Sequence, residues 1–244
     1  VLSDETIELE YRAPYLAHAP LEPVSAVVQV DDGRIDIWTG TQVPRFIQAN
    51  VAELTGLKPE DIHVHVQMMG GSFGHRLEDD YVLHAVRLAM EVPGRPVKMT
   101  YSREEDMAHD YLRQIAMARV RGSARNGQVH AFDLSIAMPS VSESQMGRQG
   151  LSLGETDPII VTGAGDQPYS IPNYRVTGYK APQLAPLSSW RSVGASTNAF
   201  FHESFLDELI HAAGADPLEE RLRLLNDATA RGVLEAVGDM SNWG

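Results

Sequence analysis

The chain has 244 residues, of which 43% are hydrophobic and 22% are charged, a composition typical of a globular protein with a substantial core. Its 33 acidic residues outnumber its 20 basic residues and give a formal charge of −13, so neither nucleic acid nor an anionic membrane surface is expected as its main partner. The absence of cysteine excludes disulfides, thiolate metal sites, iron–sulfur ligation and cysteine nucleophiles within the chain.

The N-terminal residues Val1–Asp4 lack the basic and apolar regions of a signal peptide. No apolar run in the sequence approaches the roughly 20 residues that a helix needs to cross a bilayer, so no membrane span is expected. Because the first residue is not methionine, we expect a processed or excised fragment, and its compartment is not indicated by its N-terminus.

The first predicted elements are a β-hairpin and a helix. Apolar residues alternate over 25–30 and 34–38, and Asp32–Gly33 between them forms a turn that tolerates positive φ. Pro44 stands at a favoured first helical position, and apolar residues spaced for one helical face follow it until Gly56.

A glycine-rich loop is predicted to join the next strand to the next helix. Alternating residues over 62–68 lead into Gly70–Arg76, after which apolar residues over 82–90 form a second helical stripe. A further strand is predicted over 97–101, and Ser102 with Glu105 indicates a capping box at the start of another helix.

The remaining elements complete an α+β chain. Asn126–Gly127 predicts a hairpin between 115–124 and 128–137, and residues 139–172 are expected to form a long ordered loop or a flexible segment. The elements expected after it are, in order, a short strand over 174–180, a polar loop over 186–196, a helix closed by Gly214, and a last helix capped at Asp216 that ends at Leu225. The predicted fold class is α+β, with mixed sheets and flanking helices.

The loop Gly70–Gly74 is the strongest candidate site. Glycines between a strand and a helix let backbone N–H groups approach a phosphate or an oxo ligand closely. The same five residues match the G-x-S-x-G nucleophile elbow, with Ser72 as the nucleophile. A hydrolase would also need a downstream acid and histidine, which Asp207 and His211 supply in the right order, although an i, i+4 pair on one helix is an unusual source of both.

Other polar residues have ordinary structural interpretations. His63 and His65 alternate on a strand, but no third ligand stands at a recognised metal-site spacing, and His18 is interpreted as a packed, hydrogen-bonded histidine. No metal ligand is therefore predicted. The acidic run at 78–80 is interpreted as a helix start, where carboxylates cap the helix and interact favourably with its dipole. The charged run at 103–106 is interpreted as a solvated helix start.

Four segments resemble, in order and approximate spacing, sequence blocks of one enzyme family. They are Tyr15–Pro23, Thr39–Gln42, Met68–Arg76 and Trp190–Asn198. The family is that of the large, molybdopterin-binding subunits of molybdenum hydroxylases, which includes xanthine dehydrogenase and aldehyde oxidase. The resemblance spans nearly the whole chain and is closest to the isoquinoline 1-oxidoreductase β-subunit branch.

The resemblance implies a set of cofactor-binding residues. Gly71, Ser72, Phe73 and Gly74 look like the family's glycine-phenylalanine-glycine loop, which lies against the molybdenum centre and donates main-chain hydrogen bonds. Gln42 looks like the glutamine that contacts the oxo group of the metal. Arg191 looks like the arginine whose backbone and neighbours line the same pocket.

Two departures from the family pattern bear on activity. His75–Leu77 stands where xanthine dehydrogenase has glycine, lysine and a substrate-positioning glutamate, so purine-type recognition is not expected. The catalytic base of the family, a glutamate in a glycine-rich block near the far C-terminus, has no counterpart in this sequence. The resemblance therefore implies that the chain contains no catalytic residue and is inactive alone.

The resemblance also implies a fold and a parent protein. The fold is expected to resemble the molybdenum cofactor-binding domain of aldehyde oxidase and xanthine dehydrogenase. A first α+β unit over 1–138 would carry the cofactor loop, and residues 139–244 would add a long loop, a short strand and C-terminal helices of the same cofactor-binding region. The parent is expected to be an oxidoreductase that hydroxylates N-heteroaromatics or oxidises aldehydes, with a molybdopterin-type molybdenum cofactor that the isolated fragment need not retain.

The implied partners are the remainder of the large subunit, an iron–sulfur subunit or domain, and a small aromatic heterocycle or aldehyde. The sequence itself does not indicate a compartment; by the same resemblance, the parent is expected in the bacterial cytoplasm or periplasm. Two alternatives to this interpretation stay open: a serine hydrolase that uses Ser72, and a non-catalytic binding or assembly module.

Overall fold

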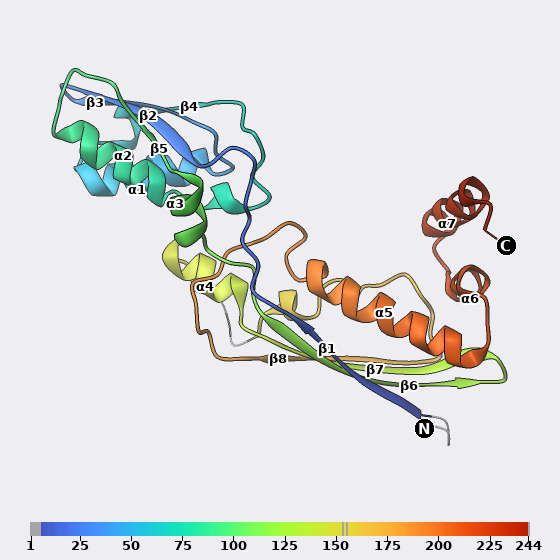
Figure 1. The fold of residues 1–244 in the computed structure, drawn as a ribbon. Helices are drawn as coiled ribbons and strands as arrows, with labels where there is room; N and C mark the ends of the chain where they lie inside the picture. The colour runs from blue at the N-terminus through green and yellow to red at the C-terminus, as the bar shows by residue number, and fades with distance from the viewer. Residues whose placement is uncertain (1–5, 153, 155, 244) are drawn as a thin grey trace.

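Two four-stranded sheets organise the chain. The computed structural model describes residues 6–152, 154 and 156–243, and it places the two sheets toward different ends of an elongated molecule (Figure 1). Each sheet has its own hydrophobic core and its own covering helices. The segments that connect the sheets lie between them and contact the loop that carries the candidate site.

The first sheet has the strand order β4-β3-β2-β5. Its strands are β2 (Ser25–Asp31), β3 (Arg34–Thr39), β4 (Ile62–Val66) and β5 (Val97–Thr100). The helices α1 (Pro44–Thr55) and α2 (Asp80–Met90) pack against it through residues such as Ile47, Val51, Val82 and Val86. The predicted hairpin, the predicted helix after Pro44 and the predicted strand–loop–helix connection are all confirmed.

The second sheet has the strand order β1-β6-β7-β8. Its strands are β1 (Thr6–Ala13), β6 (Ala116–Arg125), β7 (Gln128–Met138) and β8 (Asn173–Lys180). The long helix α5 (Ala195–Ala213) lies across this sheet and buries Phe201, Phe205, Leu206 and Leu209. A Cβ atom on Gly122 would lie 2.7 Å from Leu209 Cδ1, so the absence of a side chain at Gly122 lets the helix approach the sheet.

Both sheets are mixed, as the predicted fold class requires. β2 and β3 pair antiparallel, whereas β3 and β4 pair parallel. In the other sheet β6 and β7 form the predicted hairpin, and β7 pairs parallel with β8. The short helix α3 (Arg103–Ala108) begins at the predicted cap, because Ser102 Oγ accepts the Glu105 N–H at 3.1 Å.

Three elements differ from the sequence-based expectation. β1 was not predicted. The expectation of a loop over 139–172 is wrong in part, because α4 (Val141–Arg148) forms there with Ser140 Oγ accepting the Glu143 N–H at 3.0 Å. The helix α6 (Pro217–Leu224) is not the last one, since α7 (Ala228–Ser241) follows it.

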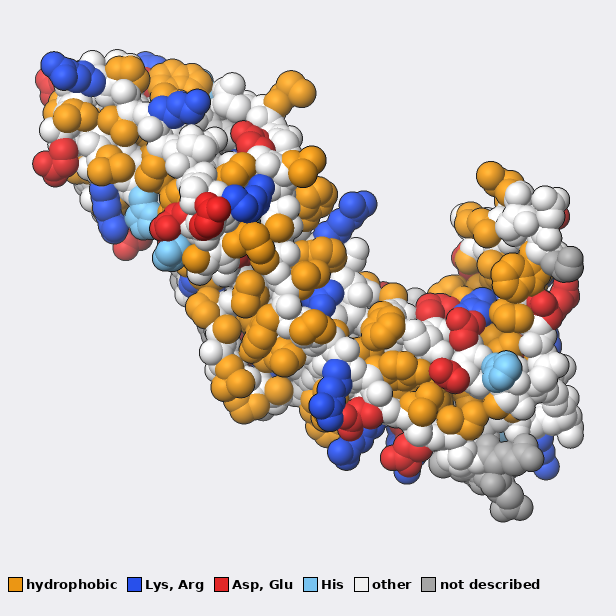
Figure 2. All heavy atoms as spheres, in the orientation of Figure 1, with side chains coloured by type: hydrophobic (Ala, Val, Ile, Leu, Met, Phe, Trp, Pro, Cys, Tyr) orange, Lys and Arg blue, Asp and Glu red, His pale blue; other side chains and the backbone are white. Residues whose placement is uncertain are grey.

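The helix α7 projects from the end of the molecule and leaves an apolar surface open (Figures 1 and 2). Its exposed hydrophobic residues include Val233, Val237 and Met240. Among the described residues of α7 only Gly238 is buried, so the helix contributes little to either core. In the described part of the chain, no helix is long and apolar enough to cross a membrane.

The connections between the sheets run beside one another. Leu16 pairs with Arg113, and Leu112 pairs with Leu187, as isolated bridges between three segments distant in sequence. The division of the chain expected between residues 138 and 139 stays a prediction; β8, which follows that point, pairs with β7, which precedes it.

The core under α5 gives a test of the fold. Leu209 is completely buried against the second sheet, so Leu209→Ala is expected to lower the free energy of unfolding by about 2–5 kcal/mol. The same truncation at Leu184, which is 83% exposed, is expected to change it by no more than about 0.5 kcal/mol. Urea denaturation of both variants measures the difference, and equal losses would contradict this packing.

Candidate functional site

The candidate site is built around the loop that follows β4. Gly71, Phe73 and Gly74 all have positive φ, at 100°, 57° and 107°. Positive φ is costly for phenylalanine, and such strain persists only where the surroundings enforce it. The Phe73 side chain is nevertheless 43% exposed, so the loop holds this ring outward at a conformational cost.

Gln42 fastens the loop from the segment between β3 and α1. Its Oε1 accepts hydrogen bonds from the Ser72 hydroxyl and, at 3.3 Å, from the Gly74 N–H. The Gln42 N–H donates to the Arg76 carbonyl at 3.0 Å. The structure therefore brings Gln42 and the predicted glycine loop together, as the sequence blocks implied.

A buried arginine holds the other side of the loop. The Arg76 guanidinium is completely buried and donates to the carbonyls of Gly71 at 3.3 Å, Gly40 at 3.3 Å and Glu22 at 3.0 Å. It also pairs with the Glu22 carboxylate at 3.2 Å, and that carboxylate accepts the Gly70 N–H at 2.5 Å. Burial of a charge is tolerated only with such full pairing.

Arg76 and Glu22 support the site but were not among the residues predicted for it. Both lie in the matched blocks, but arginine and glutamate are usually exposed, and nothing local indicated burial. The one indication in the sequence was that Glu22 and Arg76 lie in two of the matched blocks, which were expected to meet at the cofactor site.

Ser189, the residue directly before the fourth matched block, meets the loop. Gly74 passes so close that a Cβ atom there would lie 1.5 Å from the Ser189 carbonyl oxygen. Trp190 anchors this segment by donating from Nε1 to the Ala17 carbonyl at 3.3 Å. Arg191 follows directly, and its exposed side chain forms no hydrogen bond or ion pair with the described residues. Parts of all four matched segments are therefore neighbours in space.

The loop offers free hydrogen-bond donors. Within residues 6–152, 154 and 156–243, the N–H groups of Gly71, Ser72 and Phe73 have no acceptor, and neither does Gln42 Nε2. Neighbouring main-chain N–H groups in a loop with several positive-φ residues suit an anionic or oxo-bearing ligand. With the unpaired charge of Arg191 nearby in sequence, this donor set fits a negatively charged cofactor.

Ser72 is not arranged as a nucleophile. Its buried hydroxyl donates to the Gln42 amide oxygen and accepts the Arg76 N–H at 3.0 Å, whereas a nucleophilic serine needs a base as its acceptor. Asp207 of α5 instead pairs with Arg221 of α6 at 2.6 Å. Among the described residues, no histidine side chain contacts the Ser72 hydroxyl.

The other candidates have structural contacts. His65 Nε2 lies 2.8 Å from Asp36 Oδ1, and its ring stacks on Trp38. Hydrogen bonds from Arg34 and then His65 lower the pKa of Asp36. This environment agrees with the structural interpretation of His65.

The acidic run at 78–80 lies at the start of α2, as expected, but capping does not account for it. Asp79 is the N-cap residue of α2, yet its side chain caps no helix N–H and instead accepts from Asn50 Nδ2 at 2.8 Å. Glu78 pairs with Arg148 of α4 at 2.6 Å. These carboxylates thus connect α2 to α1 and α4.

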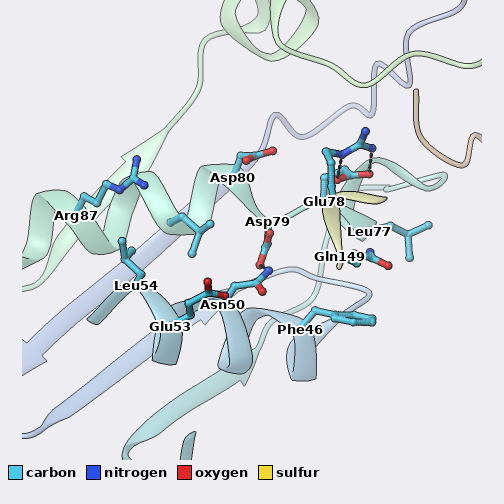
Figure 3. Close-up of a pocket in the computed structure, with 12 residues that line it drawn as sticks. Phe46, Asn50, Glu53, Leu54, Leu77, Glu78, Asp79, Asp80, Arg87 and Gln149 are labelled. Carbon is cyan, nitrogen blue, oxygen red and sulfur yellow. Dashed lines mark hydrogen bonds and ion pairs between the residues drawn. The ribbon is translucent and has the colours of Figure 1, made fainter. Parts of the chain in front are cut away.

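A cavity of about 480 Å³ lies beside these carboxylates, between α1, α2 and the end of α4 (Figure 3). Phe46 and Leu77 line it together with Asn50, Asp79 and Gln149. Burial raises the pKa of Asp79, and the neighbouring carboxylates of Asp80 and Glu78 raise it further, although the hydrogen bond from Asn50 opposes the shift.

Gly74 provides a test of the close contact with Ser189. Gly74→Ala is expected to destabilise the chain more than Gly33→Ala, because Gly33 also has positive φ but has open space around it. Gly33→Ala is the control and should lower the free energy of unfolding by about 1 kcal/mol, because alanine is strained in the left-handed conformation. Urea denaturation measures the free energy of unfolding of both variants. Equal losses in the two variants would mean that Gly74 is not confined by Ser189.

Asp79 provides a test by pH. The pKa of Asp79 is raised in the folded state. Above that pKa the folded protein must bury a charged carboxylate, which lowers the free energy of unfolding. Below the pKa of the unfolded chain, near 3.9, the carboxyl is protonated in both states and this cost disappears. Asp79→Asn is therefore expected to raise the free energy of unfolding at pH 7 more than at pH 3. Asp239→Asn on the exposed surface of α7 is the control, and an equal effect of Asp79→Asn at both pH values would contradict the assignment.

Known proteins resemble this chain in sequence and in fold. Residues 2–226 match the family profile described as molybdopterin cofactor-binding domain. The chain is 30% identical to a nicotinate dehydrogenase subunit of Pseudomonas putida, over 99% of this chain and 21% of that protein. It is also 30% identical to the β subunit of isoquinoline 1-oxidoreductase of Brevundimonas diminuta, over 96% of this chain and 30% of that protein. The chain thus spans between a fifth and a third of the length of these relatives.

Solved structures show the same fold. Quinoline 2-oxidoreductase from Pseudomonas putida 86 superposes with a TM-score of 0.75 at 18% identity, covering 98% of this chain and 33% of that chain. The aldehyde oxidoreductase from Desulfovibrio gigas gives a TM-score of 0.71 at 23% identity, over 92% and 24%. The predicted α+β fold is confirmed, and so is the family inferred from the four sequence blocks. With residues 2–226 matching its profile, the chain belongs to the family of molybdopterin cofactor-binding domains.

Proposed function

We propose that the chain forms part of the large subunit of a molybdenum-dependent oxidoreductase and holds one side of its molybdopterin-type cofactor at Gln42, Gly71–Gly74 and Arg191. The observation that carries this proposal is the meeting of Gln42 with a positive-φ loop whose N–H groups have no acceptor in the described structure. These donors are held in place before any ligand arrives, so binding need not reorganise the loop.

Each residue of the site has a distinct task in this proposal. Gln42 uses Oε1 to fix the loop, which leaves Nε2 to donate to an oxygen of the cofactor. The loop N–H groups donate to the same anionic group, and Arg191 adds positive charge. The exposed ring of Phe73 provides an apolar wall that excludes water. The bound cofactor supplies the redox-active molybdenum at which a substrate is oxidised.

The proposed substrate class is a small N-heteroaromatic compound or an aldehyde. Relatives and structural neighbours are named for nicotinate, isoquinoline, quinoline and aldehydes. Leu77, at the position of the substrate-positioning glutamate of xanthine dehydrogenase, is apolar, which favours a substrate other than a purine.

The proposed partners follow from what the chain lacks. It has no cysteine, so electrons would leave through an iron–sulfur subunit or domain outside it. The open apolar surface of α7 supports docking of the remainder of the large subunit, because contiguous exposed apolar surface on a soluble protein commonly marks an interface. The 244-residue chain alone is expected to hydroxylate no isoquinoline.

Metal and pterin analysis of the full-length subunit, co-expressed with its iron–sulfur partner, tests the proposal. The complex is expected to contain molybdenum and pterin, and Gln42→Ala is expected to weaken their retention about 10–100-fold, as loss of an orienting contact does at other metal sites. The matched control is Gln67→Ala, an exposed glutamine that does not touch the loop.

The outcomes separate the candidate functions. Equal cofactor content in the two glutamine variants would refute the placement of the cofactor at Gln42. An assembled complex without molybdenum and pterin would refute the proposed function as a whole. Labelling of Ser72 by a fluorophosphonate probe, lost in Ser72→Ala, would then favour the serine hydrolase.

A further inference from the structure

A buried cluster of His18, His75 and Asp110 lies behind the glycine loop. The side chains of His18, His75 and Asp110 are 0%, 8% and 1% exposed. His18 Nδ1 and His75 Nδ1 each lie 2.8 Å from the same oxygen, Asp110 Oδ1. One ligand atom from each residue lies within 4.8 Å of the other two. None of these residues belongs to the cofactor-binding set proposed above.

The outer nitrogen of each imidazole already has a partner. His18 Nε2 lies 3.2 Å from the Ser189 carbonyl, and His75 Nε2 lies 3.0 Å from Asp106 Oδ1. A carbonyl and a carboxylate only accept hydrogen bonds, so both Nε2 atoms carry hydrogen. In the neutral form of each ring, the lone pair is then on Nδ1 and faces Asp110.

Three lone-pair atoms therefore converge in a buried cluster. His75 Nδ1 is buried and forms no hydrogen bond of acceptable geometry despite its short distance to Asp110. Lone pairs facing each other at 2.8 Å repel unless positive charge lies between them. The site requires either a second proton on each ring or one divalent cation.

A cation bound between His18, His75 and Asp110 fits the buried arrangement of these side chains better than a second proton on each imidazole. Two protonated rings would stack with centroids 5.3 Å apart, so two like charges would face each other away from solvent. A cation between them supplies the same charge and leaves both rings neutral. A hydrogen bond from the outer nitrogen to a carbonyl or carboxylate is the arrangement that orients metal-binding histidines.

We propose that His18 Nδ1, His75 Nδ1 and Asp110 Oδ1 bind a structural divalent cation of the zinc class. Two imidazoles and a carboxylate are a ligand set that Zn²⁺ accepts. Tetrahedral coordination at the usual bond lengths spaces ligand atoms roughly 3.3 Å apart, so Asp110 Oδ1 would move by about half an ångström from its present place.

The surrounding charges favour a cation. Asp106 and Asp110 contribute two carboxylates, and only Asp106 is paired with an arginine, Arg103, at 3.0 Å among the described residues. The Asp110 carboxylate therefore brings negative charge into the cluster that no arginine of the described residues pairs, which favours a cation at this point.

The cation would stabilise the region between the two sheets by connecting segments that are distant in sequence. It would connect the segment before β2, the start of the short helix His75–Leu77 and the segment after α3, while His18 also holds Ser189. Gly74 is adjacent to His75 and confined by Ser189. The metal would therefore fix the back of the glycine loop and, being buried, would enter while the chain folds.

Metal analysis of the 244-residue chain, expressed with added Zn²⁺ and no molybdenum, tests this inference independently of the proposed function. About one Zn²⁺ per chain is expected, with a Tm that falls after refolding in a chelator and recovers with Zn²⁺. Co²⁺ in place of Zn²⁺ is expected to give the visible absorption of a tetrahedral site.

Variants locate the ion. His18→Gln is expected to abolish stoichiometric binding, and Asp106→Asn, which removes only an orienting contact, is expected to weaken it about 10–100-fold. His109→Gln is the control, since His109 lies close in sequence but is 64% exposed and outside the cluster. If a variant does not fold, the metal content of the unmodified chain still tests whether the protein binds the cation.

Less than about a tenth of an equivalent of metal in the unmodified, folded chain would overturn the inference. Nitrogen-15 NMR of that metal-free protein would then be expected to show both rings protonated on both nitrogens. Equal metal binding by His18→Gln and His109→Gln would overturn it as well, because the ion would lie elsewhere.

Discussion

The candidate site depends on one buried cation, the guanidinium of Arg76. It holds the carbonyls of Gly71, Gly40 and Glu22 and the Glu22 carboxylate. Removing any partner would leave a buried charge incompletely paired, which costs several kcal/mol. Arg76 therefore holds together the segments that contain Glu22, Gly40 and Gly71. These contacts confine the loop, and Phe73 keeps its strained positive φ because of that confinement.

The loop is fastened so that its own donors stay free. Gln42 uses its amide oxygen for Ser72 and Gly74, Arg76 takes the carbonyls, and Ser189 limits the space at Gly74. Among the described residues, the N–H groups of Gly71, Ser72 and Phe73, the Gln42 Nε2 amide and the Arg191 guanidinium stay unpaired at this site. A protein that must receive an anionic cofactor gains from this arrangement, because preorganised dipoles need no reorientation on binding.

Local signals in the sequence were sufficient for most elements. Asp32–Gly33, Asn126–Gly127 and the Ser102 cap work through turn and cap geometry that neighbouring residues decide, and each prediction was confirmed. The elements that were missed depend on distant contacts or weak burial. β1 pairs with β6, more than a hundred residues later, and α7 buries almost nothing. In α4, the cap at Ser140 was present but outweighed by the polar composition around it.

The sequence by itself determined the family, the glycine loop and its likeness to a cofactor-binding loop, since four blocks in order carry that information. It did not determine that Arg76 is buried, that Ser72 bonds to Gln42, or that His18, His75 and Asp110 share one oxygen. Only the tertiary structure decided these, because His18 and Ser189 are 171 residues apart. Such contacts depend on the path of the chain between two sheets, and no local periodicity encodes that path.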